Sequence, residues 1–84
     1  MNLDAAPSFL RRLKKLGPNE KAAVTEALER LVANPRDARL KTHKLIGNLK
    51  DSWSCSAGYD LRIVFDWQGD TVTLLDVGTH DEVY

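Results

Sequence analysis

The second half of the chain contains three short segments in which apolar and polar residues alternate, and this pattern limits the possible folds most strongly. The clearest is LRIVFDW (residues 61–67), where every odd-numbered residue is apolar and falls on one side of an extended chain. SWSCS (52–56) precedes it, TVTLLDV (71–77) follows it, and the turn sequences AGYD and QGD separate the three. The pattern predicts an antiparallel meander with one covered face and one open face.

The first half of the chain predicts the helices that cover this sheet. Apolar residues recur at helical spacing in FLRRLKKLG (9–17), and the glycine ends the segment. A second apolar stripe occupies residues 24–32 at positions i, i+3, i+4, i+7 and i+8, and Asn34-Pro35 ends it. We expect Ser8 and Asn19 to cap the two helices.

The order of these segments predicts an α+β fold, in which two N-terminal antiparallel helices pack on one face of a small antiparallel sheet. With 84 residues the chain is expected to form one domain, residues 1–84, and residues 2–5 can add a short strand. Trp53, Cys55 and Trp67 fall on the covered face. We therefore expect all three to be core residues, and Cys55 to be chemically inert.

The charges are balanced overall but divided unevenly between the two halves. Residues 1–50 carry 11 Lys and Arg against 5 Asp and Glu, a formal charge of +6, whereas residues 51–84 carry 1 against 7, a charge of −6. Such asymmetry indicates either an anionic partner on one side or a neutral protein with two solvated faces. The single cysteine fits a reducing cytoplasm, no apolar run is long enough to cross a membrane, and no Cys and His spacing is typical of a metal site.

The chain ends in GTHDEVY (78–84), which places a histidine, two carboxylates and a tyrosine after the last predicted strand. If segments 61–67 and 71–77 are antiparallel neighbours, the end of the second lies beside the start of the first. His80 is then expected to approach Asp60 and Arg62, which we place together on the open face.

Four stretches of the chain, in order, resemble the RelE/ParE superfamily of type II toxin–antitoxin toxins, and most closely its YafQ-like and RelE-like mRNA interferases: FLRRLKKLG (9–17), HKLIGNLKDSWSC (43–55), YDLRIVF (59–65) and GTHDEVY (78–84). The resemblance implies a cytoplasmic toxin of α+β fold that cleaves mRNA without a metal or other cofactor, usually in the ribosomal A site. It also implies that a cognate antitoxin protein binds and neutralises the toxin.

The resemblance further implies roles for individual residues. Members of the group have a catalytic histidine where this chain has His80, and a phosphate-binding arginine on the middle strand where it has Arg62. A histidine near the active site matches His43, and a carboxylate just before the middle strand matches Asp60. A C-terminal aromatic residue that stacks on or orients the RNA matches Tyr84.

The positive charge expected on the RNA-binding surface depends on two segments, the first strand of the predicted meander and the basic loop before it. Ser54 and Ser56 stand where the toxins that this chain resembles carry basic residues or a histidine, so we expect a less cationic open face. In the basic loop RLKTHKLIGNLK, Lys41, Lys44 and Lys50 are suited to contacts with RNA phosphates.

Metal-free cleavage of RNA to a 2′,3′-cyclic phosphate needs a base for the 2′-OH, a cation for the phosphate and an acid for the 5′-oxygen. Histidine suits either proton transfer because its ordinary pKa is about 6.5, and the fork of an arginine suits the phosphate. We expect His80, oriented by Asp81, to be the acid, and the base is the alternative role for His80. Asp60 is expected to be the base or to orient His80 or Arg62. The simpler interpretation is that these are surface residues, with Arg62 paired to Asp60 or Asp76.

Two other functions remain open from the sequence. A ParE-like protein of the same fold would poison DNA gyrase through protein contacts, and a non-catalytic, degenerate toxin would be a binding module. The histidines discriminate between these functions, because only a nuclease needs them for proton transfer.

Overall fold

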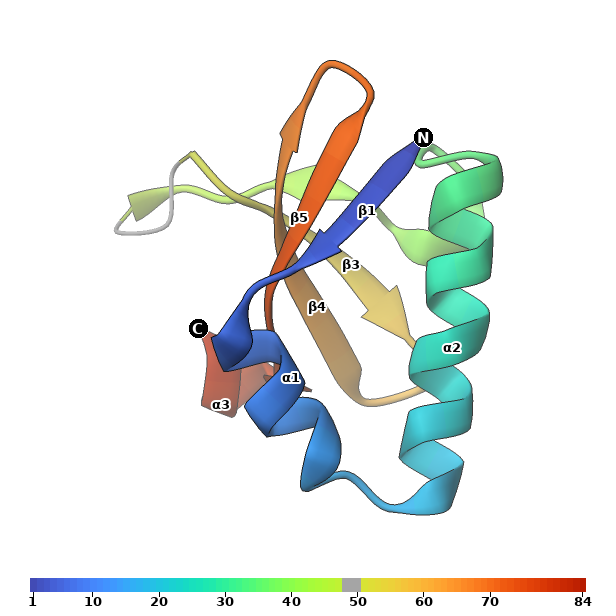
Figure 1. Cartoon of the computed structure of the whole chain (residues 1–84), viewed down its shortest axis with the longest axis vertical. Coiled ribbons are helices and arrows are strands. Elements are labelled where there is room, and N and C mark those ends of the chain that lie inside the picture. The colour runs from blue at the N-terminus through green and yellow to red at the C-terminus, as the bar shows by residue number, and fades with distance from the viewer. Residues whose placement is uncertain (48–50) are drawn as a thin grey trace.

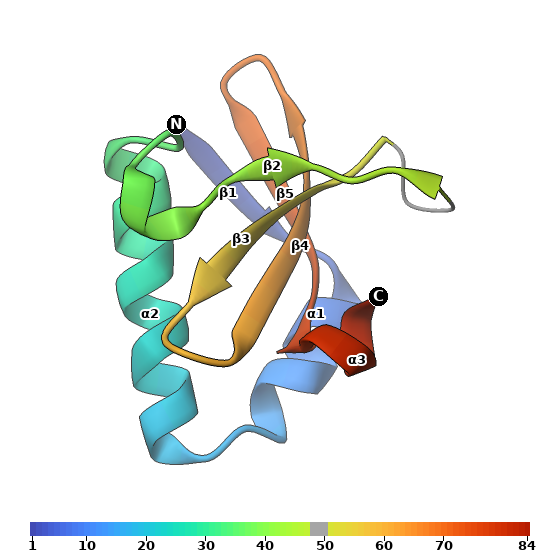
Figure 2. The ribbon, with the colours of Figure 1, turned by 180° about the vertical axis from the view of Figure 1, so that it is seen from behind.

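A five-stranded sheet in the order β1-β5-β4-β3-β2 forms the middle of the molecule (Figures 1 and 2). It is seen in a computed structural model that describes residues 1–47 and 51–84. The strands are β1 (Asn2–Ala5), β2 (His43–Lys44), β3 (Trp53–Ala57), β4 (Leu61–Gln68) and β5 (Thr71–Thr79). β1 is parallel to β5, and the other pairs are antiparallel. The predicted meander and the strand at residues 2–5 are confirmed, whereas the sequence did not predict β2.

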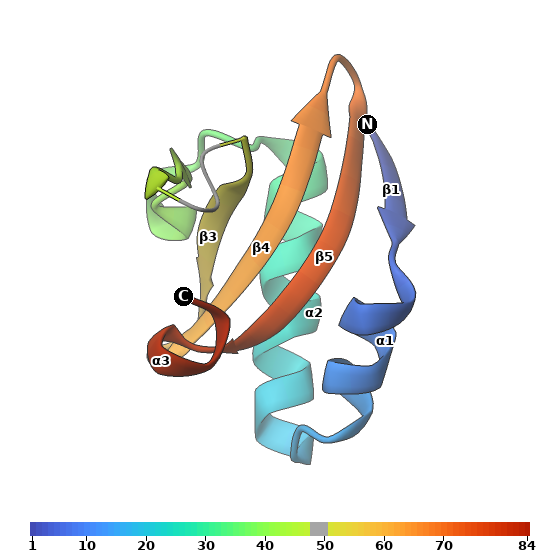
Figure 3. The same ribbon diagram turned by 90° about the vertical axis from the view of Figure 1, so that its left-hand side faces the viewer.

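Two helices precede the main sheet strands, and a short one follows them. The helices are α1 (Pro7–Lys14), α2 (Pro18–Ala33) and α3 (His80–Val83), with a 3-10 turn η1 (Ala38–Leu40). α1 and α2 run in opposite directions, with α1 beside β5 and α2 across β3 and β4 (Figures 1 and 3). The predicted α+β fold with two N-terminal antiparallel helices is therefore confirmed.

The predicted helix caps are wrong, and the reason is the same at both sites. Proline occupies the first position of α1 and of α2, because its fixed φ suits a helix start where no N–H is needed. Ser8 is consequently inside α1, where its hydroxyl donates to the Leu75 carbonyl at 2.6 Å. Asn19 lies inside α2, and the Glu20 carboxylate instead accepts the N–H of Gly17 at 3.0 Å.

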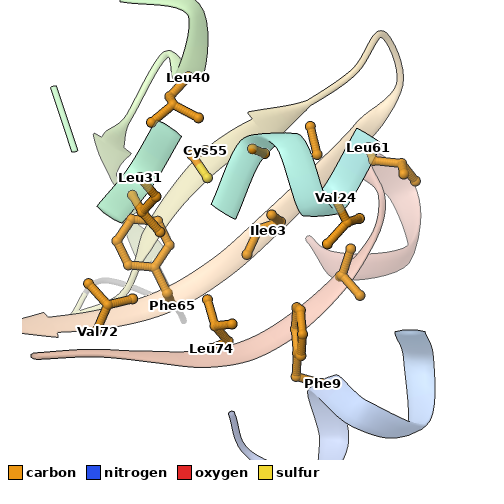
Figure 4. Packing of buried hydrophobic residues seen from close by; sticks show 13 residues of the cluster. Phe9, Val24, Leu31, Leu40, Cys55, Leu61, Ile63, Phe65, Val72 and Leu74 are labelled. Carbon is orange, nitrogen blue, oxygen red and sulfur yellow. The ribbon is translucent and has the colours of Figure 1, made fainter. Parts of the chain in front are cut away.

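The core lies between the first two helices and one face of the sheet. Ile63 and Phe65 of β4 pack with Leu31 of α2, and Phe9 joins them from α1 (Figure 4). Cys55 belongs to the same cluster and is 1% exposed. Burial raises the pKa of the Cys55 thiol to about 12, which agrees with the expectation of an inert cysteine.

The two tryptophans lie at the margin of this core rather than inside it. Trp53 and Trp67 are half-buried, pack against the cluster and meet edge to face, with ring centroids 5.0 Å apart. The Arg36 guanidinium lies 5.1 Å and 5.2 Å from the two ring centroids. The prediction that both are core residues is correct only in part. Both rings pack against the core, but they are only half-buried and also contact the Arg36 guanidinium.

Candidate active site

The open face is the side of the sheet turned away from the core, and α3 folds over part of it. Figure 3 shows α3 on the opposite side of β4 and β5 from α1. Ser54 is 0% exposed and Val64 is 3% exposed on this face, although neither belongs to the core cluster. β5 continues to Thr79, past the predicted end at Val77, and the chain then turns into α3. The tail of the chain is thus a short helix that covers part of the open face.

Strand register places one predicted site residue, His43, in a row of directly opposed residues that runs from strand to strand across this face. His43 of β2 lies opposite Ser54 of β3, and Ser54 lies opposite Val64 of β4. Val64 in turn lies opposite Asp76 of β5. Directly opposed residues of antiparallel strands point to the same face, so His43 shares the open face with Ser54.

The next row along the strands contains Arg62, between Ser56 on β3 and Gly78 on β5. Its guanidinium donates to the Leu61 carbonyl at 3.0 Å. Within residues 1–47 and 51–84, Arg62 forms no ion pair, so the alternative pairing with Asp60 or Asp76 is not seen. The remaining donors of the guanidinium are therefore available for a phosphate.

A capping box at the start of α3 turns the chain over the open face. The Glu82 carboxylate accepts the N–H of Thr79 at 2.8 Å, and the pair forms the T-x-x-E pattern. This hydrogen bond to the Thr79 backbone holds the pKa of Glu82 below its ordinary value, and Arg12 lowers it further. The sequence THDE already contains this cap signal, so α3 was readable from the sequence but was missed.

His80 is the first residue of α3 and Tyr84 is its C-cap, four positions later, so the two side chains lie next to each other. Their ring centroids are 4.6 Å apart with the rings edge to face. The Tyr84 hydroxyl forms a hydrogen bond with the hydroxyl of the buried Ser54. The Nδ1 atom of His80 lies 3.5 Å from Oδ1 of Asp81, and the His80 side chain is 66% exposed. His80 therefore stands at the solvent boundary of the site, with the exposed carboxylate of Asp81 beside its ring.

Arg12 links α1 to both the sheet and α3. Its Nε lies 3.6 Å from Oδ1 of Asp76, and its Nη1 lies 3.5 Å from Oε2 of Glu82. Its Nη2 also donates to the Glu82 carbonyl at 3.2 Å. Sequence reasoning missed this residue, because nothing local in FLRRLKKLG distinguishes Arg12 from the exposed Arg11.

The ring of His43 is held by the loop that precedes it. Its Nδ1 lies 2.9 Å from the Lys41 carbonyl oxygen, and a carbonyl oxygen only accepts, so Nδ1 carries the proton of this hydrogen bond. Lys41 has the left-handed backbone φ of 52°, which ends η1 and directs the chain into β2. In the neutral ring Nε2 is then the free proton acceptor.

Asp60 does not join these residues. It lies in the exposed turn before β4, and the ladder to β5 begins only at Leu61, opposite Thr79. Asp60 lines a small cleft together with Asn19 and Glu20 at the start of α2. The structure therefore does not bring Asp60 into contact with His80 or Arg62, and the expected shared open face is wrong for Asp60.

The expected basic loop is only partly described. Lys41 and Lys44 are both exposed, but Lys44 lies opposite Trp53 and therefore on the other face of the sheet from His43. Lys50 lies outside the described residues. In the described part of the chain, no group of three or more His, Cys, Asp or Glu side chains is placed to hold a metal ion. None of the helices found there has the length and apolar character needed to span a membrane.

Comparison with known proteins identifies the group to which this architecture is similar. A family profile described as the bacterial toxin of the type II toxin–antitoxin system, YafQ, matches residues 1–84. A search of curated proteins found no match.

Several solved structures share the fold. A copper-bound mutant toxin from Helicobacter pylori is 26% identical with a TM-score of 0.81, covering 100% of this chain and 99% of that chain. YafQ from E. coli is 15% identical with a TM-score of 0.84, covering 99% and 97%. The E. coli DinJ–YafQ toxin–antitoxin complex gives 15% identity, a TM-score of 0.81, and coverage of 99% and 96%. At 15% identity the E. coli structures establish the fold alone.

Proposed function

Because the chain belongs to the YafQ family of bacterial type II toxin–antitoxin toxins, we propose that it is an mRNA endoribonuclease that inhibits translation. The observation that supports this most is the gathering of His43, Arg62 and His80 at one face of the sheet, from three distant parts of the sequence. These are the side-chain types that metal-free RNA cleavage requires, namely two proton carriers and a cation.

In the proposed mechanism His43 is the base. Its Nδ1–H donates to the Lys41 carbonyl, so Nε2 is the atom that accepts the proton of the RNA 2′-OH. The 2′-oxygen then attacks the adjacent phosphorus, and the free guanidinium donors of Arg62 stabilise the charge that develops on the phosphate oxygens.

His80 completes the reaction as the acid. Its protonated ring, paired with the carboxylate of Asp81, gives a proton to the 5′-oxygen as the phosphorus–oxygen bond breaks. The products are a 2′,3′-cyclic phosphate and a free 5′-hydroxyl. Tyr84 provides an aromatic surface beside His80 for a base next to the cleaved bond. Asp60 has no part in this mechanism, because it lies in a turn outside the rows that hold Arg62 and His43.

The proposed partners follow from charge and from the family. Residues 51–84, which supply most of the strands of the open face, carry 1 basic residue, Arg62, against 7 Asp and Glu. A segment this acidic is poorly suited to bind free RNA, so we propose that the ribosome presents the mRNA and that the protein acts in the cytoplasm. YafQ of E. coli occurs in a complex with the antitoxin DinJ, and we propose that this chain, as a single toxin domain, has a cognate antitoxin.

Induction of the protein in growing cells tests the proposal. Wild type, His80→Ala, His43→Ala and the control Lys21→Ala are compared for growth arrest and for new mRNA 5′ ends. We expect wild type and Lys21→Ala, which changes an exposed residue on α2, to arrest growth and cut mRNA, and both histidine variants to lose cutting. Arrest with intact mRNA and a DNA-damage response would instead favour a gyrase poison, and no arrest by folded wild type would indicate a binding module.

A further inference from the structure

A helix as short as α3, four residues long, has no stability of its own in water. Its position must therefore come from contacts with the rest of the molecule. In the described part of the chain, two side chains from other elements form such contacts: Arg12 with Glu82 of α3, and Ser54 with Tyr84, which follows α3. We propose that Arg12 and Ser54 are positioning residues, which hold α3 on the open face and thereby fix where His80 and Tyr84 stand. This inference rests on the proposed ribonuclease function.

The Arg12 contact bridges three elements. Its guanidinium lies between Asp76 of β5 and Glu82 of α3 and also donates to the Glu82 carbonyl, 70 positions away in the sequence. The two carboxylates lie within ion-pair distance of the guanidinium, and the hydrogen bond to the Glu82 carbonyl is the directional contact to α3. Arg12 also offsets part of the negative charge of the two carboxylates beside the row that holds Arg62, so a phosphate approaching Arg62 meets less repulsion.

The Ser54 contact holds Tyr84, the residue that follows α3. Ser54 is 0% exposed, and its hydroxyl bonds the hydroxyl of Tyr84, the last residue of the chain. The Tyr84 ring lies edge-on to His80, so the position of Tyr84 limits the position of the His80 ring. A shift of about 1 Å in a catalytic group reduces rates by about 10²-fold.

The proposed contacts of Arg12 and Ser54 with the tail can be tested through the two tyrosines of the chain, without any assay of activity. The chain contains Tyr59 and Tyr84, and Tyr59 is 100% exposed. In protein labelled with 3-fluorotyrosine, Tyr59 gives the fluorine signal of a solvated ring and Tyr84 a separate signal. We expect Ser54→Ala to move the Tyr84 signal toward that of Tyr59, and Arg12→Gln to move it in the same direction.

Matched control variants separate loss of the Arg12 and Ser54 contacts from a general disturbance of the fold. Ser56→Ala removes a hydroxyl from the same strand and face, and Arg11→Gln removes the neighbouring arginine of α1. Both are expected to leave the Tyr84 signal in place, and Ser54→Thr, which keeps a hydroxyl, is expected to restore it. An unchanged Tyr84 signal in folded Ser54→Ala and Arg12→Gln would overturn the proposal.

Kinetics on ribosome-bound mRNA then test the positioning role. We expect Ser54→Ala and Arg12→Gln each to lower kcat at least 10-fold, with the midpoint of thermal unfolding nearly unchanged and with recovery in Ser54→Thr. Unchanged kcat in variants whose Tyr84 signal has moved would overturn the positioning role. If wild type itself cleaves no RNA, the proposed function fails, while the fluorine measurement still decides whether the two anchors hold α3.

Discussion

At the scale of single residues, Gly78 illustrates how a missing side chain shapes the site. A Cβ added at Gly78 would lie 2.9 Å from Oε1 of Glu82, 3.1 Å from its Cβ and 3.3 Å from Nη1 of Arg12. The close approach of α3 to β5 therefore requires glycine at this position, which also lies directly opposite Arg62.

Gly78→Ala is consequently expected to displace α3 more than it unfolds the protein. The contact at 2.9 Å involves a flexible carboxylate, but the one at 3.1 Å involves the Glu82 Cβ, which cannot move unless the helix moves. We expect loss of RNA cleavage with a fall in unfolding free energy of about 1–3 kcal/mol, the range for overpacking. Urea unfolding and cleavage assays on the same samples check this, and unchanged cleavage would contradict it.

His43 offers a second test at the residue scale. If Nε2 of His43 is the base, His43→Gln is expected to lower kcat about 10²–10⁴-fold, because glutamine cannot accept the proton. The acidic limb of the pH–rate profile, where the base becomes protonated, should disappear as well. Retention of that limb in His43→Gln would show that another group is the base.

At the scale of elements, the cap of α3 links the site to pH. The pKa of Glu82 is lowered in the folded state, so its stabilising contribution is present above the ordinary glutamate value of about 4.3 and is lost as pH falls through the lower folded value. We expect α3 to detach in acid before the sheet unfolds. The fluorine signal of Tyr84 measured from pH 6 to pH 2 checks this.

Glu82→Gln is the matched variant for this measurement. A glutamine oxygen still accepts the Thr79 N–H but does not titrate, so the cap should persist in acid. Its pairing with Arg12 is weaker wherever the wild-type carboxylate is ionised, because the glutamine carries no charge. A pH dependence of the Tyr84 signal that is the same in wild type and in Glu82→Gln would rule out Glu82 as its cause.

The helices and strands also show which parts of the fold could be predicted from the sequence. The alternation in residues 61–67 and the stripe in residues 24–32 predicted β4 and α2 correctly, because each pattern reports one buried face. β2 is two residues long and carries no alternation that could predict it. Asp60 was misplaced because the alternation of residues 61–67 was applied one residue further back, to the end of the turn AGYD, where side chains do not alternate between two faces.

At the scale of the whole molecule, one buried thiol reports on unfolding. Cys55 is 1% exposed and burial raises its pKa to about 12, so it is expected to react with a thiol reagent only when the core opens. Its labelling rate at pH 8 should therefore rise with urea in parallel with global unfolding. Rapid labelling of the native protein would contradict the burial of Cys55.

The amino-acid sequence by itself determined the helices, the meander, the apolar faces and, through its motifs, the candidate roles of His43, Arg62 and His80. Each of these depends on a local pattern or on the identity of a residue within a short stretch. Only the tertiary structure decided that His43 lies opposite Ser54, that Asp60 stands apart, and that Arg12 reaches Glu82. These contacts join segments far apart in the chain, and they depend on strand register and helix packing, which no local pattern encodes.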